Sequence, residues 1–246
     1  MHNHTISVGV LIIGSLYWDD TDIRTKWRER LDLDASKHVR TPIRYGRQSV
    51  KRGRSYTMVF SGVLGEGQLG CGIVVPCKRS VGTPEELVRE AKHLWAAEEE
   101  SSPTERISAR WGCVGLVRNP DRPVPEVLMK DWRALIAKEG NWGYGQLAHA
   151  ANEKPAVDRH SGFLNITWPR TQDGSTLTLD LLLATATNPT IKNGRYASAQ
   201  DVADGWITPK GKKHVNYFRK NRAHGITTFE DAEIKQVLDR STGAPR

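Results

Sequence analysis

Cysteine is scarce in this chain: its three cysteines are Cys71, Cys77 and Cys113, and no pair has the Cys-x-x-Cys spacing. An odd number without such a pair argues against a disulfide framework, so we expect small buried side chains in a reducing compartment. Long apolar runs are also missing, since no stretch approaches the roughly eighteen consecutive apolar residues that a membrane helix needs. The apolar run near the start has no Lys or Arg before it and no small-residue cleavage site after it, which argues against a secretory signal. The sequence therefore predicts a cytoplasmic protein that makes no membrane contact.

Common motifs of cofactor and metal chemistry are missing as well. No His-Glu-x-x-His motif accompanies the eight histidines, and neither Ser15 nor Ser161 lies in a Gly-x-Ser-x-Gly elbow. Residues 65–70 match Gly-x-Gly-x-x-Gly, but β-branched residues follow where a dinucleotide site would open a helix. The kinase form of this loop needs His-Arg-Asp and Asp-Phe-Gly motifs downstream, and the chain has neither. We expect a plain glycine hairpin loop, no metal and no cofactor.

Positive charge is in excess, because 36 Lys and Arg against 28 Asp and Glu leave a net charge of +8 and a pI near 9.5. Such a balance favours polyanions or anionic substrates without choosing between them. The length of 246 residues suits one large domain with an extension. We place the domain at residues 1–190 and a basic C-terminal extension, packed on it, at residues 191–246. The sequence predicts no oligomeric state.

The order of the expected elements indicates an α+β fold. Residues 83–100 form the clearest helix, since Pro84 stands just inside its start and apolar positions recur at helical spacing. Residues 55–60 and 71–75 are β-rich and predict a hairpin around the glycine loop. We expect strands over residues 8–16, 55–60, 71–75, 108–117, 163–168 and 176–187, and helices over residues 22–31, 83–100, 127–138 and 228–240. Several strands in succession favour a mixed, partly closed β-barrel with flanking helices over a regular doubly wound fold.

The first apolar run closes on a Gly14-Ser15 turn. A strand that ends in this way turns its backbone N–H groups outward, and carboxylate sites are built from such groups. Asp19, Asp20 and Asp22 follow closely and would repel a carboxylate unless they point away as helix caps. The clearest helix ends in Glu98, Glu99 and Glu100, three acids that oppose the helix dipole and so require an explanation. The turn and this acidic helix end are the candidate site.

The Gly14-Ser15 turn, the strand at residues 72–75 and the helix end at residues 94–98 resemble the gamma-glutamyl cyclotransferase-like superfamily. That family carries a Tyr-Gly-Ser-Asn-Leu type turn after its first strand, a Gly-Val-Val-Tyr type central strand and a helix ending in Leu-Asp-x-x-Glu. This chain departs from the pattern at three positions, with Ile13 in place of Tyr, Leu16 in place of Asn and Trp95 in place of Asp. The resemblance covers about the first half of the chain.

The resemblance implies a cofactor-free enzyme of the lyase or acyltransferase type that forms 5-oxoproline from a γ-glutamyl amine or peptide. The main chain of Ile13, Gly14, Ser15 and Leu16 would bind the substrate α-carboxylate, since glycine allows close approach. Glu98 would act as general base on the α-amino group, which then attacks the γ-carbonyl. The rate of this intramolecular attack would be raised mainly by the orientation of the bound substrate. Glu99 or Glu100 could take the role of base in place of Glu98. Two other interpretations stay open: the three acids are solvent-exposed charge at a helix end, or the chain is a catalytically inactive member of the fold.

A binding module is the alternative from a different class. Lysines at 210, 212 and 213 precede Arg219, Lys220 and Arg222, and aromatic residues are interleaved with these cations. The interleaving is typical of surfaces that follow a phosphate backbone and stack bases, and Trp142 and Tyr144 could extend it. A charge run of this kind is also typical of a solvated face, and no helix-turn-helix or zinc-finger signature accompanies it. We therefore keep Lys210, Lys212, Lys213, Arg219, Lys220 and Arg222 as candidate nucleic-acid contacts.

Overall fold

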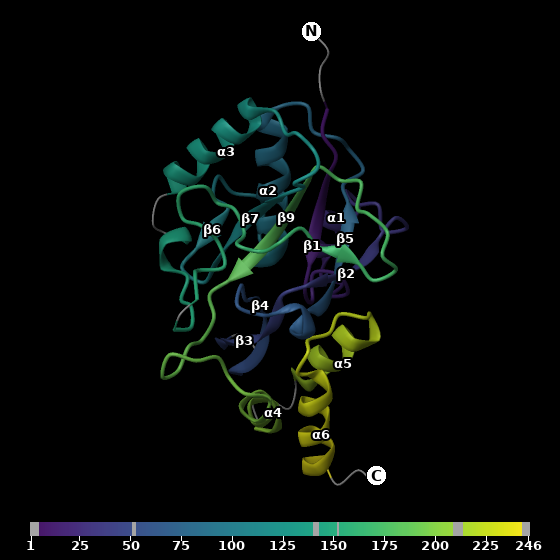
Figure 1. The fold of residues 1–246 in the computed structure, drawn as a ribbon, viewed down its shortest axis with the longest axis vertical. Helices are drawn as coiled ribbons and strands as arrows, with labels where there is room; N and C mark the ends of the chain where they lie inside the picture. Colours follow the sequence, from purple (N-terminus) through teal and green to yellow (C-terminus); the bar gives the residue numbers. More distant parts are fainter. Residues whose placement is uncertain (1–4, 51–52, 140–142, 152, 209–213, 243–246) are drawn as a thin grey trace.

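The computed structural model describes residues 5–50, 53–139, 143–151, 153–208 and 214–242 of the chain. These residues form a mixed seven-stranded sheet, a separate two-stranded sheet and six α-helices (Figure 1). The strands are β1 (Val8–Ile12), β2 (Lys37–Thr41), β3 (Ile43–Ser49), β4 (Ser55–Phe60), β5 (Gly70–Pro76), β6 (Ser108–Ala109), β7 (Gly112–Arg118), β8 (Arg170–Thr171) and β9 (Leu181–Thr187). The helices are α1 (Asp22–Arg28), α2 (Pro84–Glu99), α3 (Glu126–Glu139), α4 (Ala199–Ile207), α5 (Val215–Ala223) and α6 (Asp231–Thr242). The α+β class with a mixed sheet is confirmed.

The large sheet has the order β6-β7-β9-β1-β5-β2-β8. β1 lies at its centre, parallel to β9 and antiparallel to β5. Every residue of β1 is buried, and so are the first six residues of β5. Strands that read as continuous apolar runs need cover on both faces, and this explains why these two lie inside the sheet. The end of β1 thus emerges from the middle of the sheet, where side chains from several elements can reach it.

No closed barrel forms among the described residues, so of the expected mixed, partly closed barrel only the mixed sheet is found. Closure requires the two edges of a sheet to pair with each other. Here the edges are β6 and β8, and each has two residues, too few for a ladder of hydrogen bonds. β3 and β4 stand apart as their own antiparallel pair. The sheet is therefore open, with this small sheet beside it.

Three details of the strand prediction are wrong. Residues 55–60 and 71–75 are strands but not a hairpin, since β4 pairs with β3 while β5 lies between β1 and β2. Residues 163–168 form only isolated bridges, at Phe163 and Leu164. The last expected strand is limited to the seven residues of β9. Local β-propensity finds extended segments, whereas the rest of the fold decides which neighbours complete a ladder.

Helix α2 forms as expected. Thr83 and Glu86 make a capping box around its first turn, with Pro84 at the first helical position. Its apolar face contacts β7 and β9, and the helix also contacts α1 and α3. This packing carries the C-terminal end of α2 to the place where β1 ends. In Figure 1 both elements lie in the upper half of the molecule, away from the C-terminal helices α4, α5 and α6.

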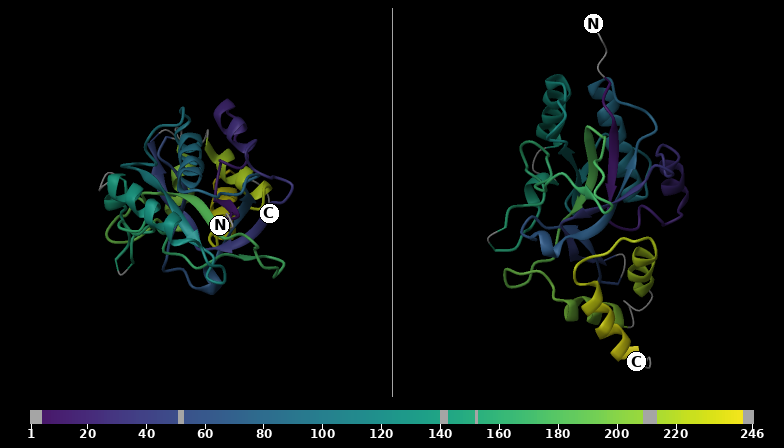
Figure 2. Two further views of the ribbon diagram at one scale, coloured as in Figure 1. Left: turned by 90° about the horizontal axis from the view of Figure 1, so that it is seen from above. Right: turned by 45° about the vertical axis from the view of Figure 1, so that its right-hand side comes forward.

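The C-terminal helices pack on the rest of the protein at the end opposite the amino terminus (Figure 2). The Tyr45 ring of β3 meets Trp206 of α4 edge-on, with ring centroids 5.0 Å apart. Arg44 of β3 donates to the buried carboxylate of Glu230 at 2.8 Å. These buried contacts attach the C-terminal segment, from α4 to the start of α6, to the small sheet. The boundary expected at residue 190 stays a prediction.

The cysteines are all free, with Cys71 and Cys113 buried and Cys77 partly so. Burial raises the pKa of Cys71 to about 11 and that of Cys77 to about 12. They are therefore poor nucleophiles, because the thiolate is the reactive form. None of the described helices is long and apolar enough to cross a membrane.

Candidate active site

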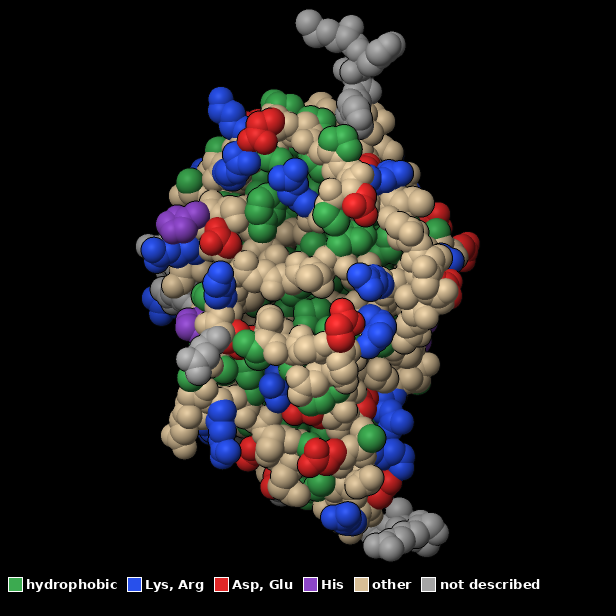
Figure 3. All heavy atoms as spheres, in the orientation of Figure 1, with side chains coloured by type: hydrophobic (Ala, Val, Ile, Leu, Met, Phe, Trp, Pro, Cys, Tyr) green, Lys and Arg blue, Asp and Glu red, His purple; other side chains and the backbone are tan. Residues whose placement is uncertain are grey.

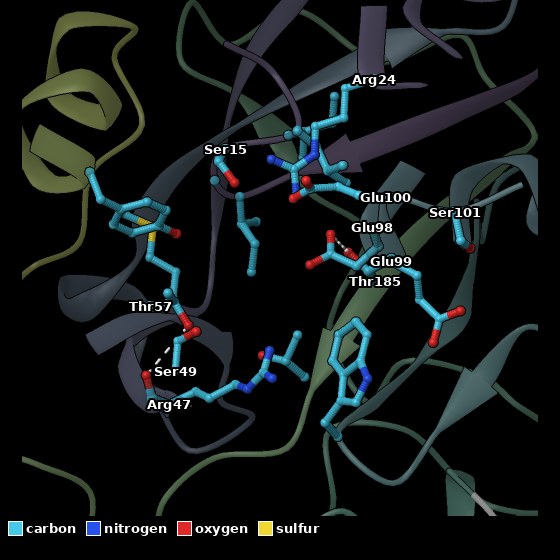
Figure 4. A pocket seen from close by; sticks show the side chains of 18 residues that line it. Ser15, Arg24, Arg47, Ser49, Thr57, Glu98, Glu99, Glu100, Ser101 and Thr185 are labelled. Atoms are coloured by element: carbon cyan, nitrogen blue, oxygen red, sulfur yellow. Dashed lines mark hydrogen bonds and ion pairs between the residues drawn. The ribbon is translucent and has the colours of Figure 1, made fainter. Parts of the chain in front are cut away.

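Residues from distant parts of the chain line one cavity of about 480 Å³ at the end of β1. Volumes of roughly 300–1,000 Å³ are typical of small-molecule sites. Its walls come from the turn after β1, from β3 and β4, from the C-terminal end of α2, from the end of β9, and from Arg24, Trp111 and Tyr217. Figure 4 shows these side chains around the open space.

The turn after β1 forms one wall of the cavity, and Ile13, Gly14, Ser15 and Leu16 all line it. The carbonyls of Gly14 and Ser15 accept the hydrogen bonds that close the turn, from the N–H groups of residues 17–19. A side chain at position 14 is excluded, since a Cβ there would lie 2.6 Å from the hydroxyl oxygen of Tyr217. The buried guanidinium of Arg28 donates to the Leu16 carbonyl at 2.9 Å. The turn is therefore held in place from outside the cavity.

Two of the acids that follow the turn are each paired with an arginine, which offsets their repulsion of an anion. Asp19 forms an ion pair with Arg24, and Asp20 with Arg28 at 2.6 Å. Both guanidinium groups are buried, at 3% and 7% relative exposure of the residue. The pairing answers the objection for Asp19 and Asp20, and Asp22, exposed in the first turn of α1, does not line the cavity.

Glu98 reaches the cavity from the last turn of α2. Its side chain is half-buried, and Oε2 accepts a hydrogen bond from the Thr185 hydroxyl of β9 at 3.3 Å. Glu99 also lines the cavity and is half-buried, while Glu100 is exposed. Glu98 is thus aimed by a neighbouring strand and is not a freely solvated charge.

Arg24 explains why three acids are tolerated at the end of α2. Its Nε donates to the Ala97 carbonyl at 3.2 Å, and its Nη2 lies 3.1 Å from Oε1 of Glu100. A buried cation at this end satisfies a terminal carbonyl and offsets the negative pole of the helix. Glu100 itself ends the helix in the left-handed region, with φ of 56°. The helix terminus and the turn after β1 are therefore tied together through Arg24 and Asp19.

The structure brings the predicted turn residues and Glu98 into one cavity, and it adds residues that sequence reasoning missed. The guanidinium of Arg47 lies 4.7 Å from the ring centroid of Trp111. The Trp111 ring in turn stacks on Trp95, with centroids 4.7 Å apart and an interplanar angle of 22°. Trp95, where the family pattern has Asp, is 1% exposed and supports Trp111 from the core. No local motif marks Arg47 or Trp111, because their contact joins β3 to the turn between β6 and β7.

A β-bulge directs Arg47. The register of β3 against β4 shifts between Tyr45 and Arg47. Gly46 is required there, since a Cβ at this position would lie 2.5 Å from a methyl group of Val59. Residues two apart in a regular strand share a face, but here Tyr45 is buried against Trp206 while Arg47 enters the cavity. A glycine within an otherwise β-rich segment is the one sequence signal that could have indicated this bulge.

The candidate nucleic-acid contacts are only partly described. Lys210, Lys212 and Lys213 lie outside the described residues, as does Trp142. The remaining three cations, Arg219, Lys220 and Arg222, are exposed on α5.

Two of these cations pack against neighbours. The Lys220 ammonium lies 4.9 Å from the Trp18 ring centroid, and Arg222 lies 3.8 Å from an Asp231 oxygen. Tyr144 does not extend this surface, because it is 1% exposed and its hydroxyl donates to a backbone carbonyl inside the core. On the face in Figure 3, basic and acidic side chains are interspersed. Nucleic-acid binding stays an untested prediction.

Among the described residues, no group of three or more His, Cys, Asp or Glu side chains has the arrangement of a metal site. Side chains would also fit at two glycines of the loop at residues 65–70, since a Cβ at Gly65 or Gly67 would meet no atom within 4 Å.

Comparison of the chain with protein-family models, with curated proteins and with solved structures found no match. The resemblance to the cyclotransferase-like superfamily therefore stays a hypothesis that depends on the motifs themselves.

Proposed function

We propose that this cavity binds a γ-glutamyl amine or peptide and converts it to 5-oxoproline and a free amine. The observation that carries the proposal is the convergence of the turn at Gly14 to Leu16 with Glu98 on one cavity of about 480 Å³. The two features lie more than eighty positions apart in the sequence, and each is held in place by a bond from a third element: Arg28 to Leu16, and Thr185 to Glu98. A hydrogen bond from a neighbouring element that fixes the position of a site group is typical of a preorganised catalytic group.

The chemistry needs few groups. The substrate α-carboxylate would lie against the main chain of the turn, which places the α-ammonium toward Glu98. Glu98 accepts one proton from the ammonium, and the nitrogen attacks the γ-carbonyl carbon of the same molecule. The new C–N bond closes the five-membered ring, and the old amide C–N bond breaks. Both protons shed by the ammonium end on the departing nitrogen, so that the amine leaves as an ammonium and Glu98 is regenerated.

Replacing the base tests the proposal. Glu98→Gln keeps the size of the side chain and an oxygen that can accept from Thr185, so we expect an unchanged melting temperature. Formation of 5-oxoproline from γ-glutamyl-L-alanine should fall by about 100-fold or more, the usual contribution of a general base. Glu66→Gln, on the exposed glycine loop, is the matched control and should leave the rate unchanged.

Two outcomes would contradict the assignment. Full activity in Glu98→Gln together with loss of activity in Glu99→Gln would move the base to the neighbouring acid. If the intact protein forms no 5-oxoproline from any γ-glutamyl compound, the proposed reaction is rejected and the chain is an inactive member of the fold.

A further inference from the structure

A second cavity, of about 600 Å³, lies between α1, α2 and the segment after β5. Two carboxylates line it, those of Glu29 and Glu90, together with four cations: Lys26, Arg30, Lys78 and Arg79. A hollow with an excess of one sign of charge attracts ions of the other sign. Among the described lining residues, this cavity shares only Ser101 with the candidate active site. A ligand bound here would therefore leave the proposed cyclisation site free, and the inference does not rest on that function.

One cation and one acid of this cavity neutralise each other. Arg30 donates from Nε to Oε2 of Glu90 at 3.1 Å, and its Nη2 donates to the other carboxylate oxygen. Glu90 belongs to α2 and is 8% exposed, so the forked pair is a buried part of the wall. The Arg30 carbonyl also accepts from the N–H of Lys78 at 2.9 Å. These bonds join α2 to the segments after α1 and after β5, and they fix the walls relative to one another.

Three cations then face one acid. Lys26, Lys78, Arg79 and Glu29 are all exposed. Neither Lys26 nor Lys78 has a side-chain hydrogen bond or ion pair with any other residue in the part of the chain that the structure describes. Several separate point charges suit an anion with more than one negative charge, and a phosphate monoester carries about −1.5 to −2 at pH 7. The charges of the cavity therefore match a phosphoryl group.

The same cavity has an apolar wall, to which Ile23 and Trp27 of α1, Ala96 of α2 and Pro103 contribute. Its volume lies in the range that small organic molecules fill, so that there is room beyond a phosphoryl group. We propose that this cavity binds a small phosphate ester, with the phosphoryl group at Lys26 and Lys78 and the organic part on the apolar wall.

His93 of α2 gives this binding a spectroscopic signature. Its ring lines the cavity and is half-buried. Burial lowers the pKa of His93; the charges of Arg30 and Arg89 lower it further, and that of Glu90 opposes them. A phosphoryl group in the cavity adds negative charge beside the ring. The pKa of His93 should therefore rise when the ester binds.

Calorimetric titration with phenyl phosphate, inorganic phosphate and phenol at low ionic strength tests the proposal. Phenyl phosphate should bind about tenfold or more tightly than either fragment, since only it has both the charge and an apolar part. Replacing both lysines, Lys26→Gln with Lys78→Gln, should weaken its binding by about tenfold. Lys130→Gln, at an exposed position of α3, is the matched control and should leave the affinity unchanged. NMR titration of His93 with and without phenyl phosphate measures the shift in its pKa.

Each other outcome contradicts a definite part of the proposal. Equal affinities for phenyl phosphate and inorganic phosphate would assign the cavity to free phosphate and overturn the ester. A loss of the same size in Lys130→Gln would show a general attraction of anions to a basic protein and overturn the site. Binding that leaves the pKa of His93 unchanged would place the ester elsewhere. Absence of binding by phenyl phosphate would overturn the proposal outright, whatever the result of the 5-oxoproline assay.

Discussion

Arg24 links the two halves of the candidate site, and replacing it should destabilise the protein measurably. Its side chain is buried and reaches Asp19 at the turn, Glu100 at the end of α2 and the Ala97 carbonyl. Arg24→Met keeps the apolar stem and removes all three interactions. The loss at the Ala97 carbonyl costs about 1–3 kcal/mol, because a buried acceptor is left without its donor. The two carboxylates are partly exposed, at 31% and 44% of their side chains, so each pair adds only about 0–1 kcal/mol.

The expected total is therefore about 1–5 kcal/mol in the free energy of unfolding. In a domain of this size each kcal/mol lowers Tm by about 2–4 °C, so Tm should fall by about 2–20 °C. Urea unfolding and calorimetry both measure the change. Arg133→Met is the matched control, because its ion pair with Glu126 is exposed on both sides and contributes under about 1 kcal/mol. A variant at position 24 that is no less stable than the control would refute this account of the helix end.

Two further predictions concern pH and polyanions. Hydrogen bonds from the N–H and hydroxyl of Ser161 hold the pKa of Asp158 below its usual range, so the carboxylate stabilises the fold above the unfolded pKa of about 4 and loses this contribution as pH falls through the lowered value. The difference in Tm between the intact protein and Asp158→Asn should then be largest near neutral pH and shrink in acid, and a difference independent of pH would contradict this. If the basic segment binds nucleic acid, the affinity for single-stranded RNA should fall steeply with salt and weaken on neutralising Lys212, Lys213, Arg219 and Lys220. The absence of a salt-dependent gel shift would reject nucleic-acid binding.

Several elements could be read from the sequence because their causes are local. Helix α2 begins where Thr83, Pro84 and Glu86 form a cap within a single turn. The strand character of β1 and β5 lies in their own apolar residues, and the Gly14-Ser15 turn follows directly from where β1 stops. Glu98 could be singled out because acids at a helix C-terminus are unfavourable without a partner. These signals act over a few residues, and a single sequence contains them in full.

Other features were decided by packing between distant segments. The partner of β4 is β3 and not β5, because β5 has the apolar run that fits the centre of the sheet. Arg24, Arg47 and Trp111 become part of the cavity only when α1, β3 and the segment before β7 converge on the end of β1. The sequence by itself determined the turn, the acidic helix end and the α+β class. Only the tertiary structure decided that the turn after β1 and Glu98 face one cavity, and that Arg24 ties the turn to the end of α2. Such long-range contacts depend on how all the elements pack together.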